Sequence, residues 1–157
     1  MQLVDVVLGE VIPKSLRKSI MSDLKFRGHC YCGDVQFDID GEPKWISHCH
    51  CESCRRHTAS VVATFVSFGV NQIKFTRTLP VSHSSENGII RSFCGKCGSP
   101  VSYESNKNRA EGNTNLYLGI FDEPEMLIPQ EHGFYREHVA WLNIDDGLPR
   151  NEGLSVY

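Results

Sequence analysis

The stretch CHCESC at residues 49–54 is the part of the sequence from which the fold can be interpreted, because it places three thiols within six residues. Cys30 and Cys32 lie upstream of it, and Cys94 and Cys97 lie downstream. All seven cysteines of the chain therefore fall into three tight clusters. Close pairs of this kind are typical of metal ligation in a reducing, cytoplasmic compartment, and an odd total fits poorly with a fully paired disulfide framework.

The two outer clusters together predict one structural zinc site. Residues two apart on a strand point the same way, so Cys30 and Cys32 can face one metal ion. Cys94 and Cys97 have the spacing of a zinc knuckle, with glycines that allow the backbone to turn around the metal. Four thiolates complete a tetrahedral zinc site, which would hold the first third of the chain to its middle. The alternative, a redox or buried-thiol role for these four cysteines, is disfavoured by their paired spacing.

The central cluster predicts a second zinc ion with a catalytic role. Cys49, Cys51 and Cys54 supply three ligands, and catalytic zinc sites combine three protein ligands with a fourth position for water or substrate. A different pairing of the cysteine clusters remains open. So does a second structural site, completed by one of three nearby histidines: His48, His50 or His57.

Three side chains directly after this cluster are candidates for binding substrate: Arg55, Arg56 and His57. Three thiolates on a dication leave one net negative charge, which the two arginines would compensate. Arginine also binds carboxylates with two parallel hydrogen bonds, so either could hold an acidic substrate. The alternative for Arg55 and Arg56 is a solvated surface pair. His57 or His50 is a candidate proton shuttle, because histidine titrates near neutral pH.

The overall composition suits one globular domain and gives no sign of a nucleic-acid or membrane partner. The chain has 157 residues and a formal net charge of -3, so it lacks the basic surface that nucleic acids or anionic membranes attract. No apolar run reaches the length of a membrane-spanning helix. Residues 24–150 are expected to form the zinc domain. Residues 1–23 are interpreted as a dispensable extension, with Met1 or Met21 as the start, and residues 151–157 as a tail.

Short segments of alternating apolar and polar residues predict a mainly β fold. Strands are expected within residues 24–31, 35–39, 44–48, 60–68, 71–76, 89–93, 100–104 and 115–121. Other expected elements are a helical turn at 52–58, a hairpin at 79–88, a mobile loop at 105–114, and a strand or helix within 131–142. Trp45 and Trp141 are expected in the core.

The cysteine motifs, taken with their neighbours, resemble one known family. The sequence reads GHCYCG at 28–33, CHCESCRR at 49–56 and FCGKCGSP at 93–100, and a later segment reads DDGLP at 145–149. In this order the motifs resemble the glutathione-dependent formaldehyde-activating enzymes, also called the GFA or centromere-protein-V domain. The resemblance covers about residues 24–150 and implies an Mss4-like folded β-sheet domain with a four-cysteine zinc site.

The resemblance also implies an activity and its ligands. Cys30, Cys32, Cys94 and Cys97 would hold structural zinc, whereas the three central cysteines would hold catalytic zinc. The family's named activity joins formaldehyde to glutathione, so the expected function is a carbon–sulfur lyase acting on a small thiol and an aldehyde. A homodimer is compatible with this expectation. Ala59 stands where the family often has glycine, which places a side chain near the presumed ligand.

Two other functions are kept as alternatives. The chain could bind glutathione or a related thiol at zinc without turning it over. It could also be a zinc-stabilised module for protein interactions, because a fold alone does not determine a function.

Overall fold

The computed structural model describes residues 6–7, 10–11 and 24–153. Strands β1 (Val6–Val7) and β2 (Glu10–Val11) pair antiparallel. The rest of the expected extension, residues 1–23, lies outside the described residues, so its dispensability stays a prediction. In the described part of the chain, no helix has the length and apolar character needed to cross a bilayer.

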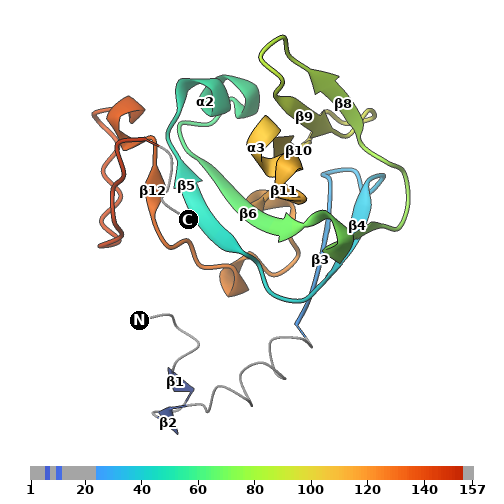
Figure 1. Ribbon diagram of the computed structural model, residues 1–157, viewed down its shortest axis with the longest axis horizontal. Helices are drawn as coiled ribbons and strands as arrows, with labels where there is room; N and C mark the ends of the chain where they lie inside the picture. Colours follow the sequence, from blue (N-terminus) through green and yellow to red (C-terminus); the bar gives the residue numbers. More distant parts are fainter. Residues whose placement is uncertain (1–5, 8–9, 12–23, 154–157) are drawn as a thin grey trace.

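A seven-stranded sheet forms the larger part of the fold (Figure 1), with strand order β12-β5-β6-β11-β10-β9-β8. Neighbouring strands are antiparallel except for β12 and β5, which run parallel. The bounds in this order are His132–Gly133, Trp45–Cys49, Ala63–Gly69, Asn113–Tyr117, Pro100–Glu104, Ile90–Phe93 and Val81–Ser84. As its β-branched and aromatic residues predict, β6 is buried along most of its length.

A smaller sheet of three strands packs against the larger one. It consists of β3 (Lys25–His29), β4 (Gln36–Asp40) and β7 (Ile73–Phe75), in that order. The alternation in β3 and β4 turns Phe26, Phe37 and Ile39 into a core shared with the larger sheet. Phe26, for example, packs on Phe68 of β6 with ring centroids 5.9 Å apart. The mainly β, Mss4-like fold class predicted from the sequence is therefore confirmed.

A second, smaller core lies beneath the helix that follows the central cysteines. Helix α2 spans Glu52–Thr58, and buried Cys54 packs with Ala63, Phe65 and Tyr117. This arrangement confirms the expected helical segment at 52–58.

Three sequence predictions about the later part of the chain have different outcomes. The expected mobile loop at 105–114 contains helix α3 (Asn106–Ala110), because Ser105 and Asn108 form a capping box, and β11 already begins at Asn113. Within residues 131–142, strand β12 pairs with β5 and Tyr135–Glu137 forms a 3-10 turn, so the strand or helix expected there is confirmed, although both elements are short. Trp141 is 74% exposed, so its expected place in the core is wrong, whereas Trp45 packs against the smaller core.

The remaining connections are short. They comprise the 3-10 turns Val70–Gln72, Leu118–Ile120 and Pro124–Met126. Because the turn at Leu118–Ile120 follows Tyr117, the strand expected at 115–121 ends earlier than predicted.

Candidate metal centres and the pocket between them

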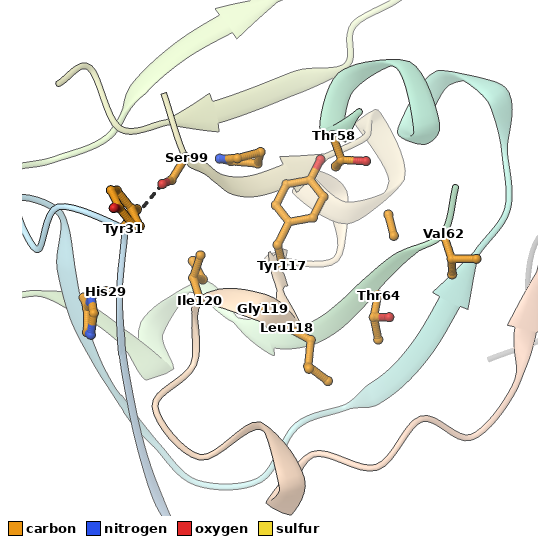
Figure 2. A pocket seen from close by; sticks show the side chains of 12 residues that line it. His29, Tyr31, Thr58, Val62, Thr64, Ser99, Tyr117, Leu118, Gly119 and Ile120 are labelled. Atoms are coloured by element: carbon orange, nitrogen blue, oxygen red, sulfur yellow. Dashed lines mark hydrogen bonds between the residues drawn. The ribbon is translucent and has the colours of Figure 1, made fainter. Parts of the chain in front are cut away.

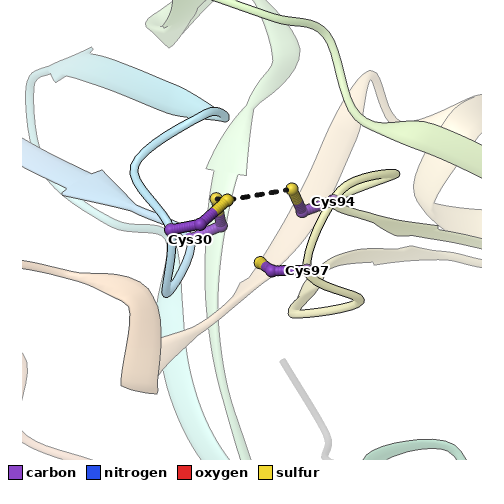
Figure 3. A group of neighbouring side chains, drawn as sticks. Cys30, Cys94 and Cys97 are labelled. Carbon is purple, nitrogen blue, oxygen red and sulfur yellow. Dashed lines mark hydrogen bonds between the residues drawn. The ribbon is translucent and has the colours of Figure 1, made fainter.

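Four cysteine sulfurs meet where the two sheets are joined (Figure 3). Cys30 follows β3 of the small sheet, and Cys94 follows β9 of the large one. The Cys30 and Cys32 sulfurs are 3.6 Å apart, and those of Cys32 and Cys94 are 3.8 Å apart. Sulfur atoms about 2.3 Å from a tetrahedral zinc ion lie about 3.8 Å from one another. We call this group, with Cys97, the quartet; its donor set and spacing fit zinc.

The backbone around the quartet supports thiolate ligands. The Val35 amide donates to the Cys30 sulfur over 3.3 Å. The Ser99 hydroxyl lies 3.2 Å from the Cys97 sulfur, and this contact, with the Ser99 amide, lowers the pKa of Cys97 to about 5. Gly98 has a φ of 77°, a conformation that glycine adopts without strain, and it completes the expected knuckle. All seven cysteines are free thiols.

A second group of three sulfurs, the trio, lies at the start of α2. Cys49 ends β5, Cys51 is the N-cap residue of the helix, and Cys54 lies in its first turn. The Cys51 sulfur accepts the Cys54 amide over 3.2 Å, so one ligand also caps the helix. The three sulfurs lie within 4.8 Å of one another. Strand end, cap and first turn thus bring three soft donors together, and these donors also suit zinc.

The charges of the trio are strongly coupled. Hydrogen bonds from Cys49 and then Cys54 lower the pKa of Cys51 to about 2, whereas the contact with Cys51 raises the pKa of Cys49. Three thiolates this close repel one another, and a divalent cation is the group that would hold all three deprotonated.

Arg91 is a site residue that the sequence did not reveal. This side chain of β9 is only 9% exposed and lies 3.7 Å from the Cys54 sulfur through Nη2. Nη2 also donates to the Ser53 hydroxyl over 2.9 Å, and Nη1 donates to the Tyr117 hydroxyl over 2.9 Å. Arg91 therefore offers the positive charge that the sequence suggested for Arg55 and Arg56. An arginine inside a predicted strand is the one local signal that could have indicated it.

The three predicted substrate-binding residues lie on α2 but have different surroundings. The Arg55 guanidinium donates to the backbone carbonyls of His50, over 2.8 Å, and of Glu137. Arg56 is exposed and pairs with Glu52 over 2.6 Å. His57 is half-buried against the Tyr117 ring, with centroids 6.0 Å apart. Their role in binding substrate stays a prediction.

His50 belongs to a buried chain rather than to the trio. Its Nε2 lies 2.8 Å from Nδ1 of His132, and Nε2 of His132 lies 2.9 Å from Asp146. A carboxylate only accepts, so Nε2 of His132 donates to Asp146, and in a neutral His132 ring Nδ1 then accepts from His50. Burial, and then the neighbouring His132, lower the pKa of His50 to about 4, which keeps this ring neutral.

Among the described residues, no histidine joins the trio to complete a second structural site. In the part of the chain that the structure describes, the group of ligand atoms contains three sulfurs and no histidine nitrogen. His48 instead contacts the Thr64 hydroxyl over 2.8 Å. His132 was uninformative in sequence because it lies 82 positions from its partner His50 and meets it through the parallel pairing of β12 with β5.

A pocket of about 640 Å³ has lining residues that neighbour both cysteine groups, and Figure 2 shows its lining side chains. Tyr31, between two quartet ligands, and Ser99, just after the quartet, form one side. Thr58, at the end of α2, and Ala63, which pairs with Cys49, form another. The remaining lining residues are His29, Val62, Thr64, Pro100, Tyr117, Leu118, Gly119 and Ile120. Residues next to both cysteine groups thus line one cavity.

Ala59 adopts a left-handed conformation with φ 52° at the C-cap of α2. Glycine is the residue that adopts this conformation most readily, which accounts for its frequent presence at this position in the resembled family. Ala59 is exposed and lies outside the pocket lining. The substitution therefore acts on the backbone of the turn, and the Ala59 side chain does not line the pocket.

Comparisons with known proteins agree with this geometry. A family model described as glutathione-dependent formaldehyde-activating enzyme matches residues 25–137, which include all seven cysteines. A crystal structure of a Rhodobacter sphaeroides protein matches with a TM-score of 0.51 and 16% sequence identity. That match covers 80% of this chain and 98% of the Rhodobacter chain, and at this identity it concerns the fold alone. The comparison with curated proteins found no match.

Proposed function

The chain belongs to the family of glutathione-dependent formaldehyde-activating enzymes, and from this premise we propose that it is a zinc-dependent carbon–sulfur lyase. Its substrates would be a small thiol, such as glutathione, and an aldehyde, such as formaldehyde. In the forward direction a carbon–sulfur bond forms and gives an S-hydroxymethyl product. In the reverse direction that bond breaks and releases the aldehyde. Free cysteines in metal-binding clusters suit the cytoplasm, where thiols stay reduced.

Two zinc ions with different roles are part of this proposal. Cys30, Cys32, Cys94 and Cys97 would hold the structural ion, and the trio would hold the catalytic one. When bound, zinc lowers the pKa of a coordinated thiol and thus favours the nucleophilic thiolate near neutral pH.

The observation that carries the proposal is the position of the trio next to the pocket. Three sulfurs leave room in a tetrahedral zinc site for one outside donor, as in catalytic centres. Ala63 pairs with Cys49, Tyr117 packs in one core with Cys54, and both residues line the pocket, so a ligand there would lie near the trio. Holding two small reactants there would supply a large part of the rate gain through proximity and orientation. Arg91, beside Cys54, would offset the surplus negative charge of three thiolates.

The test replaces Cys54 by serine. The wild-type protein should contain two zinc ions per chain and form the thiol–formaldehyde adduct, followed by exchange NMR. Cys54→Ser should keep the quartet's zinc, lose the second ion and lose roughly 100-fold or more in rate. Lys74→Ala, on the exposed face of β7, is the matched control and should behave as the wild type.

The outcomes separate the proposal from the alternatives. Full activity of Cys54→Ser with one zinc ion per chain would exclude catalysis at the trio. Zinc-dependent binding of glutathione by the wild type, measured calorimetrically, without any acceleration of adduct formation would favour a thiol carrier instead. Absorption spectroscopy showing that glutathione leaves the ligands of both zinc ions unchanged would favour a scaffold for protein interactions.

A further inference from the structure

Tyr117 is the residue that joins the trio to the pocket. It ends β11, is 6% exposed and lines the pocket, where Figure 2 shows its ring among the other lining side chains. The same ring belongs to the small buried core with Cys54, and Cys49 and Cys51 pack against that core. A reactant held beside the trio within the pocket would therefore meet the Tyr117 side chain.

The hydrogen bond from Arg91 determines what the Tyr117 hydroxyl can do. Nη1 of Arg91 donates to the phenol oxygen over 2.9 Å. A guanidinium group has no acceptor, so the proton of the phenol is directed away from Arg91 and is available to another oxygen. A tyrosine phenol loses its proton only near about pH 10, so at neutral pH Tyr117 keeps its proton and can act as a donor.

The surroundings hold this donor in place. Arg91 is itself fixed by the Ser53 hydroxyl at 2.9 Å and by the Tyr103 ring, whose centroid lies 4.9 Å from the guanidinium carbon. The Tyr117 ring packs on Phe65, with centroids 4.7 Å apart. Donors fixed before the reaction stabilise developing charge without the cost of reorganising during it.

We propose that the Tyr117 hydroxyl is a catalytic hydrogen-bond donor to the aldehyde oxygen, and that Arg91 is the positioning residue that orients it. This inference rests on the proposed function. The thiolate sulfur forms a bond to the aldehyde carbon, and the carbonyl π electron pair moves to the oxygen. Tyr117 donates its hydrogen bond to the resulting alkoxide, which takes a proton from water that balances the proton released by the thiol. In the reverse reaction the product hydroxyl gives its proton to water, the alkoxide re-forms the carbonyl as the carbon–sulfur bond breaks, and the bond's electron pair leaves with the thiolate.

The first test is Tyr117→Phe, which keeps the ring and removes the donor. Loss of one oxyanion donor should reduce kcat about 100-fold, with zinc content and glutathione affinity unchanged. Tyr135→Phe is the matched control, because Tyr135 lies in the C-terminal segment outside the pocket lining, and it should keep its rate within about twofold. A Tyr117→Phe rate within twofold of the wild type would overturn the proposal.

A binding measurement tests the same donor without catalysis. S-(2-hydroxyethyl)glutathione carries a hydroxyl near the sulfur, whereas S-ethylglutathione does not. The wild type should bind the hydroxyethyl thioether roughly five- to tenfold more tightly by calorimetry, and Tyr117→Phe should bind both equally. Equal binding by the wild type, or a preference that survives in Tyr117→Phe, would overturn the role of Tyr117. If the wild type shows this preference but no adduct formation, the proposed reaction fails while the donor stands.

Arg91→Lys tests the positioning role, since lysine keeps the charge but loses the planar fork. It should lower kcat about tenfold and weaken the preference for the hydroxyethyl ligand, with zinc content unchanged. Because Arg91 acts through Tyr117, the double variant should be no slower than Tyr117→Phe alone. Additive losses in the double variant would overturn the coupling between the two residues.

Discussion

The quartet and the trio use the same chemical group in opposite ways. The quartet draws its ligands from two sheets, with Cys32 and Cys94 separated by 62 positions in the chain. The trio draws its three ligands from six consecutive residues at the end of β5 and the start of α2. A metal ion at the quartet therefore closes a long loop, whereas one at the trio closes only a short one.

The trio region is instead held by protein contacts. The chain from His50 through His132 to Asp146 ties it to the C-terminal segment, and Arg55 ties it to the carbonyl of Glu137. Arg91 joins it to β9. This difference indicates that zinc at the quartet would stabilise the fold, whereas zinc at the trio would be available to bind a substrate.

The largest expected effect on stability comes from replacing one cysteine in each group in turn. Structural zinc contributes roughly 10–16 kcal/mol in small peptides, which is comparable to the whole stability of a domain. Cys30→Ser should therefore leave the domain largely unfolded at room temperature. Cys49→Ser should fold and lose only the trio's zinc. Thermal unfolding by circular dichroism and zinc analysis measure both. Equal unfolding temperatures for the two variants would break the comparison.

A substitution of His50 tests whether protein contacts, rather than zinc, stabilise the trio region. The pKa of His50, about 4, lies below its ordinary value, so the unfolded state binds the proton first as pH falls. This group therefore opposes folding below about pH 6.5, and stability should rise between pH 5 and 7 by up to about 2 kcal/mol. His50→Asn should reduce this rise and, through the lost bond to His132, cost about 1–3 kcal/mol at pH 7.

Urea unfolding of the zinc-loaded wild type and His50→Asn at several pH values measures this effect. The comparison between the two proteins cancels the pH dependence of zinc binding that they share. If the free energy of unfolding depends on pH equally in both proteins, His50 is not the source of the pH dependence.

The smallest effect distinguishes the two arginines of α2. Arg55→Ala should cost about 1–2 kcal/mol, because the part-buried carbonyls of His50 and Glu137 lose their donor. Arg56→Ala should change stability by less than about 0.5 kcal/mol, because its ion pair with Glu52 is exposed. Urea unfolding of both variants checks this difference. A higher KM for glutathione in Arg56→Ala would support the predicted role in substrate binding. An unchanged KM would indicate that Arg56 forms only a surface ion pair.

The sequence was sufficient for the features that depend on local spacing. The three cysteine motifs gave the division into quartet and trio, and the alternation at Phe26, Phe37 and Ile39 gave the strands of the small sheet. Such patterns can be recognised because ligand spacing and strand periodicity are properties of a few consecutive residues. The capping box at Ser105 is equally local, and it explains why α3 forms where the polar composition predicts a loop.

The tertiary structure alone decided which distant residues surround the trio. Arg91, Tyr117 and His132 carry no motif, and each reaches the site through strand pairing or through packing between elements far apart in the chain. It also decided that Trp141 is exposed and that Ala59 lies in a left-handed turn. A sequence specifies which side chains can ligate a metal within a short segment, but only the packed sheets determine which charges and donors lie beside it.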